Sequence, residues 1–547
     1  MIEFQHKLPT RYADGKPCGT FNNRELGFPS ILTTSDPDLG KFIAQLRANI
    51  NADRSLVFVE DKILMTNKNW IRDHVHVMKA MRHWEYDLGS FFNFILDTQR
   101  EDGQFFEMLK QMDDKHWSFV NDDCNLFYPE DNLALTRLEL EADIEYLMVE
   151  GAVILYKTTG DDQWLEKALP KLEKGIRYVT SDPKRWDEAH GLVKRPFTID
   201  TWDFTSAPDA QTNRKIEAHT PMSILHGDNS GVYQAMHQLA WLNRRLGREE
   251  AAKAWEAKAA TLRENMFRYL WNGKFFLHQL HLNHKGIDDL EAERLSLSNP
   301  YDINRHVTDL AQSRSIIEEY LRRRETTQLF SEWFTIDPPY EKFQWYPRGE
   351  YVNGAISPFT AGELAKAAFQ NGYEAYGWDI LQRFRKLVER DGDAYFLYFP
   401  DSSPPPERGP SAWGAAALIN AVDEGLAGIV DLGVNYDEIA FSPRFPVTHY
   451  TELRYFTGYE VSHTKVDVRY ILTEAGMRYD VLSPAKTIAA HILLPAGKQC
   501  KTLLVNGVET PFTVEMVGDS TYCNRTVPAA GKVSFELLFV ENHDEMR

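Results

Sequence analysis

The sequence lacks the features that define several classes of protein. Its 547 residues include only four cysteines, which lie far apart and form no Cys-x-x-Cys pair, so neither a zinc knuckle nor a disulfide framework is indicated. No stretch approaches the roughly 20 apolar residues of a membrane helix, and the first residues lack the apolar core of a secretory signal. A P-loop and a Gly-x-Gly-x-x-Gly motif after a strand are also missing, which argues against nucleotide chemistry. We therefore expect a cytoplasmic protein with reduced cysteines.

Positive charge is the minority charge in this chain. There are 61 Lys and Arg against 80 Asp and Glu, a formal net charge of -19, which repels nucleic-acid backbones and anionic lipid surfaces. The 43% of hydrophobic and 12% of aromatic residues are typical of a folded, soluble protein. We expect neither a nucleic-acid nor a membrane partner and no cofactor. The sequence does not indicate an oligomeric state.

A helical hairpin recurs through the middle of the chain. Its clearest copy joins an apolar helix face at 144–155 to a second helix ending near Tyr178, through a turn at Gly160. Further copies, some of them shorter, lie at 73–99, 229–271, 299–320 and 358–384, and a helix at 413–428 has a partner near 38–50. The copies are roughly 60 to 80 residues apart, too far for ordinary solenoid repeats. This spacing predicts a mainly α protein in which six helical hairpins close into a ring.

The pattern changes from helical to strand-like after about residue 441. Segments such as 466–471 and 533–537 alternate apolar and polar residues, and Asn506-Gly507 is typical of a hairpin turn. We predict an irregular segment at 1–37, the ring of helices at 38–440 and a C-terminal β-sandwich domain at 441–547.

Long irregular segments precede several predicted inner helices, and an aromatic and charged cluster at 69–74 stands at the start of one inner helix. Trp70 can stack on a sugar ring while Arg72 and Asp73 hydrogen-bond adjacent hydroxyl groups. The alternative interpretation is that Asp73 caps the following helix and pairs with Arg72.

Two further clusters of this kind follow. Asp203 lies between Trp202 and Phe204, where desolvation can raise its pKa as a general acid requires, although a turn acid beside core aromatics would have the same sequence. The third cluster, at 345–354, contains Glu350, a candidate base or hydroxyl ligand whose alternative is a capping or solvent-facing glutamate.

Possible metal ligands give weaker signals. His278, His281 and His284 are three residues apart without an acidic partner at a set spacing, which favours an ordinary polar surface. The acidic pairs at 122–123 and 130–131 do not match an EF-hand loop and are more typical of a solvated loop. We predict no metal site.

At the aromatic and charged clusters the sequence resembles the six-hairpin glycosidases, whose catalytic domain is an (α/α)6 barrel. The segment 70–73 is similar to the Trp-Pro-Arg-Asp of glucoamylases, which holds the terminal sugar. The segment 200–203 is similar to their Asp-Leu-Trp-Glu, and 202–205 to part of the Gly-Trp-Asp-Phe-Ser of trehalases, and both place the general acid at Asp203. With the helices at 351–365 and 413–426, the resemblance covers roughly residues 38–445.

The resemblance implies a glycoside hydrolase that cleaves terminal O-glycosidic bonds of a carbohydrate substrate. The enzyme would be inverting and exo-acting, and its substrate would be an α-glucoside-like oligosaccharide or small glycoside. Its substrate-binding residues would be Trp70, Arg72, Asp73, Trp202, Trp345, Arg348, Asn353 and Trp413. The segment 395–401 departs from the family because it lacks the expected base glutamate. Glu350 is the first choice for the base, Glu407 the second, and Asp401 is also eligible. The alternatives are a glycoside phosphorylase, in which phosphate attacks instead, and a carbohydrate-binding protein without catalysis.

Overall fold

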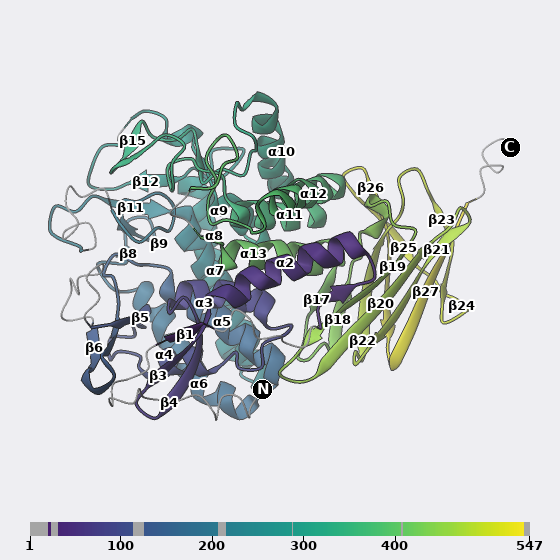
Figure 1. Cartoon of the computed structure of the whole chain (residues 1–547), viewed down its shortest axis with the longest axis horizontal. Coiled ribbons are helices and arrows are strands. Elements are labelled where there is room, and N and C mark those ends of the chain that lie inside the picture. The colour runs from purple at the N-terminus through teal and green to yellow at the C-terminus, as the bar shows by residue number, and fades with distance from the viewer. Residues whose placement is uncertain are drawn as a thin grey trace.

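The computed structural model describes residues 20–22, 31–112, 125–205, 215–286, 288–405 and 409–540. The acidic pair at 122–123 and Glu407 lie outside these ranges. Figure 1 shows the helices gathered in one part of the molecule and the strands β17 to β27 in a second part beside it. Within the described ranges, no helix has both the length and the apolar character that crossing a membrane requires.

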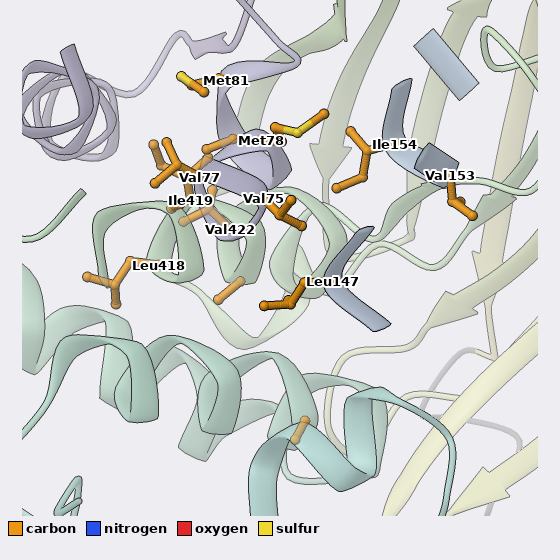
Figure 2. Close-up of a cluster of buried hydrophobic side chains, with 14 of the residues drawn as sticks. Val75, Val77, Met78, Met81, Leu147, Val153, Ile154, Leu418, Ile419 and Val422 are labelled. Carbon is orange, nitrogen blue, oxygen red and sulfur yellow. The ribbon is translucent and has the colours of Figure 1, made fainter. Parts of the chain in front are cut away.

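Six of the described helices contact one another in a closed ring. They are α3 (Ile71–Met81), α5 (Ile144–Thr159), α7 (His226–Arg245), α9 (Ser298–Asn304), α11 (Pro358–Gln370) and α13 (Ala412–Asn420). Each packs against the next, and α13 packs against α3. Figure 2 shows apolar side chains of α3, α5 and α13, among them Val75, Leu147 and Ile419, gathered between these helices.

A second set of helices packs outside this ring. These are α2 (Pro37–Asp53), α4 (Ser90–Asp97), α6 (Asp162–Val179), α8 (Glu249–Leu270), α10 (Leu310–Thr326) and α12 (Glu374–Asp391). The hairpin predicted at 144–178 is present as α5 and α6. Helix α5 ends at Gly160, whose φ of 66° suits a residue without Cβ, and the Asp161 carboxylate accepts a hydrogen bond from the Trp164 N–H at 2.9 Å to begin α6.

Small residues let the inner helices approach closely. A Cβ built at Gly362 of α11 would lie 2.5 Å from the carbonyl carbon of Ala417 and 2.7 Å from the Leu418 nitrogen, both on the backbone of α13. Because a backbone gives way less easily than a side-chain end, Gly362→Ala is expected to lower the free energy of unfolding by about 1–3 kcal/mol. Thermal unfolding beside Gly409→Ala, whose Cβ would meet open space, measures this. Equal melting temperatures for the two variants would show that the close approach does not constrain the ring.

Two sheets form the strand-rich part. One has the order β17 (Ile429–Asp431), β18 (Glu438–Phe441), β22 (Thr487–Leu493), β26 (Ser520–Pro528) and β25 (Thr513–Val517). The other has the order β2 (Thr33–Thr34), β19 (Glu452–Tyr459), β20 (Thr464–Leu472), β21 (Gly476–Ser483), β27 (Gly531–Phe539), β23 (Cys500–Val505) and β24 (Val508–Glu509). The Phe441 ring of the first sheet lies 5.5 Å from Tyr479 and 6.2 Å from Phe535 of the second, so the sheets pack face to face.

Details of these sheets bear on the sequence predictions. The predicted turn at Asn506-Gly507 joins β23 and β24, with φ angles of 53° and 79°. The strands begin at β17, earlier than residue 441, and β2 adds a strand from the start of the chain. The domain limits at 37 and 440 stay predictions. Cys500 and Cys523 form no disulfide.

Short sheets stand in the segments that precede the inner helices. They are β1 (Thr20–Asn22), β3 (Arg54–Val59) and β4 (Lys62–Asn67); β5 (Met108–Gln111), β6 (Asn125–Tyr128) and β7 (Leu133–Thr136); β8 (Trp186–Asp187) and β9 (Leu192–Val193); β10 (Arg195–Pro196), β11 (Met222–Leu225) and β12 (Gln279–His281); β13 (Leu295–Ser296) and β14 (Ile336–Asp337); β15 (Lys342–Phe343) and β16 (Tyr346–Pro347). These pairings hold the long segments at the N-terminal ends of the inner helices.

Candidate active site

Arg72, in the first turn of α3, lies in a buried cluster of carboxylates. Its guanidinium pairs with Glu141 and with Asp143, donating to the Asp143 Oδ1 at 3.0 Å, and lies 3.6 Å from Glu107. The Arg72 side chain is 7% exposed, and the three acids are buried. Because Glu107 lies near the start and the other two acids lie at the end of the segment between α4 and α5, Arg72 ties both parts of this segment to the start of α3. The cluster is referred to below as the Arg72 cluster.

Burial and the Arg72 charge act in opposite directions on these acids. Burial raises the pKa of Glu107 to about 7 and that of Glu141 well above its ordinary value, although Arg72 opposes both shifts. Burial would also raise the pKa of Asp143, but its ion pair and hydrogen bond with Arg72 hold it at about 2. The cluster therefore combines an ionised carboxylate with carboxyl groups that keep a proton near neutral pH.

The raised pKa of Glu107 makes stability depend on pH. Between its ordinary value of 4.5 and about 7, the folded protein holds a proton that the unfolded chain has lost, so the free energy of unfolding falls as the pH rises through this window. Glu107→Gln retains an acceptor for the Leu138 N–H and removes this titration. The wild-type melting temperature is therefore expected to fall relative to that of Glu107→Gln between pH 4.5 and 7. Glu101→Gln, at an exposed residue, is the control, and its melting temperature is expected to follow that of the wild type across this pH range. If the curve of melting temperature against pH for Glu107→Gln were also parallel to that of the wild type, the assignment would be wrong.

Arg195, on β10, connects the Arg72 cluster to the segment that carries Asp203. It lies 3.8 Å from Glu141 and 3.6 Å from Asp228, and it donates to the backbone carbonyl of Trp202. Burial raises the pKa of Asp228 to about 6, against the opposing charge of Arg195. Both carboxylate oxygens of Asp228 are buried without a hydrogen-bond partner among the described residues. Such groups are most often satisfied by water or a ligand.

Asp203 and Asp73 are partly exposed carboxylates that lie far apart in the sequence but interact electrostatically in the fold. The charge of Asp203 acts on both Asp73 and Glu107. Burial is the main reason that the pKa of Asp73 is raised, and the neighbouring carboxylates raise it further, whereas Lys68 and Arg72 lower it. The structure thus brings together the two predicted elements at 70–73 and 202–205.

The turn before Asp203 is held by Asp200. This residue has a φ of 51°, and its buried carboxylate accepts hydrogen bonds from the Ser298 hydroxyl and, at 3.1 Å, from the Ser298 N–H. Its own N–H donates to His278 Nε2 at 2.9 Å. His278 is fully buried, and both His278 and His281 lie near Glu291. The expectation of a polar surface at these histidines was wrong for His278, because its side chain is buried. The acid near it, Glu291, lies in a later segment that the spacing of the histidines did not indicate.

Aromatic rings form one wall beside Asp203. Trp202 and Tyr351 stack at 5.3 Å with an interplanar angle of 7°, and Phe204 stacks on Trp345 at 6.1 Å. Trp202 is 9% exposed and its indole N–H is buried without a described partner, whereas Trp345 is 57% exposed. The segments at 202–204 and 345–351 therefore meet, and Trp345 offers an open ring face at the rim of the site.

The other predicted substrate-binding residues occupy different settings. Trp70 is half-buried beneath the Lys110 ammonium at 5.3 Å, and Arg348 is exposed and pairs with Glu341 at 2.8 Å. Asn353 is buried and bonds the backbone of Tyr340 and Tyr346. Trp413 is 7% exposed, donates to the Tyr301 hydroxyl at 3.0 Å and stacks on His76. Their roles toward a substrate stay predictions.

The three candidate bases are not equivalent. Glu350 is exposed and directly precedes Tyr351, which stacks on Trp202. Asp401 is exposed, and both the N–H and the hydroxyl of Ser403 donate to its carboxylate. Glu407 lies outside the described residues. Glu350 keeps its place as the first candidate because its loop forms part of the aromatic wall.

Sequence reasoning missed all four buried acids around Arg72 and Arg195. Glu141 and Asp143 directly precede α5, and Asp228 lies in the first turn of α7, so their position before an inner helix is a signal that was available. Glu107 has no such signal. Within the described ranges, no group of three or more His, Cys, Asp or Glu side chains is arranged to hold a metal ion.

This chain was compared with known protein families, curated proteins and solved structures. No family model and no curated protein matches the chain. The α-L-rhamnosidase from Dictyoglumus thermophilum matches with a TM-score of 0.60 and 11% identity, over 94% of this chain and 51% of its own. The α-L-rhamnosidase of Streptomyces avermitilis, solved with L-rhamnose, matches with a TM-score of 0.58 and 13% identity, over 93% and 42%. This chain thus spans about half the length of these rhamnosidases.

A shorter enzyme matches over its whole length. The GH63 mannosylglycerate hydrolase from Thermus thermophilus, in complex with Tris and D-glycerate, has a TM-score of 0.50 and 14% identity, over 71% of this chain and all of its own. The rhamnosidases and this hydrolase are six-hairpin glycosidases, the group that the motifs at 70–73 and 202–205 resemble. At the level of the fold, the chain is therefore similar to the six-hairpin glycosidases.

Proposed function

We propose that this protein is a glycoside hydrolase that cleaves terminal O-glycosidic bonds at the N-terminal ends of its inner helices. In this proposal the ring of six helices is the inner wall of an (α/α)6 barrel, and the two packed sheets are a β-sandwich domain behind it. The observation that carries the proposal is that Asp203, Asp73, the Arg72 cluster and the aromatic wall interact with one another near the N-terminal ends of the inner helices. Carboxylates beside stacked rings are the groups that glycosidic cleavage requires.

Asp203 is proposed as the general acid that protonates the leaving oxygen. It is partly exposed, so a substrate can reach it, and it stands between two buried rings. Asp73 is the second candidate for the same role, because its pKa is raised. Arg72 is proposed to position the site rather than to grip a sugar directly, since its guanidinium is buried and committed to three carboxylates.

Glu350 is proposed as the base that activates water, which makes the enzyme inverting. An inverting pair of carboxyl groups stands about 6.5–9.5 Å apart when the substrate is bound, whereas a retaining pair stands about 5–5.5 Å apart. Proton NMR of the first sugar released tests this proposal. The anomer opposite to that of the substrate is expected first, and the same anomer would replace the proposal with a retaining mechanism.

The proposed activity is tested by incubating the purified protein with aryl glycosides in both anomeric forms. The panel includes α-glucosides, which the sequence motifs favour, and α-L-rhamnosides and mannosides, which the structural neighbours suggest. We expect release of the aryl group from at least one α-glycoside. A protein that binds members of the panel but releases nothing from any of them would be a carbohydrate-binding protein instead.

A further inference from the structure

A cavity lies between the inner helices, at the end of the ring away from the proposed active site. It has a volume of about 230 Å³ and is lined by residues from α3, α5, α7, α9 and α11 and from the segments that follow α3, α9 and α13. Arg72 and Asp143, by contrast, stand at the opposite ends of α3 and α5. We call this cavity the lower chamber.

The lower chamber has more cationic than anionic groups. Its lining includes the cations Lys79, Arg82, Lys157, Arg305 and Lys366 against the carboxylates Glu150, Glu363 and Glu424. Three of the cations are neutralised within the chamber. Lys79 lies 3.1 Å from Glu150 and 3.7 Å from Glu363, while Arg82 and Lys366 both pair with Glu424. Buried charges normally have such partners, because an unpaired buried charge is expensive to desolvate.

The other two cations bond only to neutral acceptors among the described residues. Lys157 donates to the backbone carbonyl of Asp431 and lies 5.3 Å from the Trp241 ring centre. Arg305 donates to the Gly227 carbonyl and the Ser230 hydroxyl, both at 2.9 Å. The chamber therefore has two positive charges that no described carboxylate pairs with.

The surroundings of Lys157 would be improved by an anion. Burial lowers the pKa of Lys157, and the cations Arg82 and Lys366 lower it further, although Asp431 and Glu424 oppose them. An anion between these three cations would relieve their repulsion and give Lys157 a charged partner. Asp423, which follows α13, lies 4.0 Å from Arg82, but burial raises its pKa to about 6 and it accepts a hydrogen bond from the Tyr455 hydroxyl.

The backbone beside the chamber is also unusual. The residues Ala421–Leu426, directly after α13, form a π-helix that carries Glu424 into the chamber lining. Isolated π-helical turns are rare and occur often at functional sites, because the extra residue alters which side chains face inward. Glu424 thereby holds Arg82 and Lys366 near Lys157.

We propose that the lower chamber binds a small divalent oxyanion between Lys157 and the pair formed by Arg82 and Lys366. The simplest such ligand is inorganic phosphate, and sulfate shares its charge and shape. This binding site is separate from the proposed active site, and the proposal does not depend on the glycosidase activity. Lys157 and Arg305, the two lining cations that pair with no described carboxylate, favour a divalent ion, and the volume admits a compact one.

Isothermal titration calorimetry of phosphate into the whole protein at pH 8 and constant ionic strength tests the site. The wild type is expected to show one saturable site, with sulfate competing and monovalent acetate binding at least about tenfold more weakly. Lys157→Met keeps most of the side-chain volume and is expected to weaken phosphate binding by about tenfold or more, the value of a lost charge-assisted hydrogen bond. The control Lys171→Met removes a lysine of α6 that pairs with exposed Asp97 and is expected to bind as the wild type does.

A second variant covers the case in which Lys157→Met does not fold. Gln238 of α7 is partly exposed and lines the chamber, so Gln238→Glu adds a carboxylate there and is expected to weaken phosphate binding as well. Absence of saturable phosphate binding by the wild type would overturn the proposal. Wild-type affinity in a folded Lys157→Met, or in Gln238→Glu, would overturn it too, because the phosphate would then bind elsewhere.

Discussion

Replacing Asp203 by Asn is expected to lower kcat/KM by about 10²–10⁴ on glycosides whose leaving group needs a proton, which is the usual contribution of a general acid. Asn keeps the size of the side chain and removes the proton that the leaving oxygen would take. Steady-state kinetics on an alkyl glycoside or an oligosaccharide measures this loss. The control Asp61→Asn changes an exposed acid in the turn between β3 and β4, and its activity is expected to match the wild type.

The leaving group separates the role of an acid from that of a base. An activated aryl leaving group departs without protonation, so Asp203→Asn is expected to lose much less activity on a dinitrophenyl glycoside than on an alkyl glycoside. A base is needed for both substrates, so Glu350→Gln is expected to lose activity on both. If Asp203→Asn stayed within a few-fold of the wild type on alkyl glycosides, Asp73 would take its place as the acid.

Replacing Arg72 by Met is expected to lower the free energy of unfolding by about 3–5 kcal/mol, the usual cost of removing one partner from a buried ion-pair cluster. Glu107, Glu141 and Asp143 would then face one another without the cation that separates them. Since protonation relieves this repulsion, the loss is expected to be larger at pH 8 than at pH 5. Urea-induced unfolding at both pH values measures it.

The matched control for Arg72 is an arginine in an exposed ion pair. Arg454 pairs with Asp467 on the surface of the seven-stranded sheet, and Arg454→Met is expected to unfold at a urea concentration close to that of the wild type. An equal effect of the two substitutions would mean that the Arg72 cluster does not hold the pre-helix segments together. The account of the site would then lose its central positioning residue.

The helices were predictable from sequence because their signals are local. The apolar face at 144–155 predicts α5, and the glycine turn at Gly160 predicts where α5 ends and α6 begins. Both signals lie within or directly beside the helices that they predict. The early strands β2 and β17 have two and three residues, too few for an alternating pattern to be recognised. Their place in the sheets depends on distant partners such as β19 and β18, which periodicity does not indicate.

The candidate site was predictable where its residues stand together in the sequence. Trp202 and Asp203 form a recognisable motif, as do Arg72 and Asp73. Glu107 has no neighbours in the sequence that mark it, because its raised pKa comes from burial and from the charges of Asp203 and Asp143 across the fold, which Arg72 opposes. Asn353 was expected in the site from the family resemblance, and its role toward a substrate stays a prediction; its amide bonds to the backbone of its own loop, which no local pattern indicates.

Hydrolysis in water enriched in ¹⁸O tests the central claim most directly. The protein is incubated with the best substrate of the glycoside panel, with and without phosphate, and the released sugar is analysed by mass spectrometry. The account predicts a free sugar that carries one ¹⁸O at its anomeric carbon, at a rate that does not depend on phosphate, because water attacks that carbon. A sugar phosphate formed only when phosphate is present, or no released sugar under either condition, would contradict it.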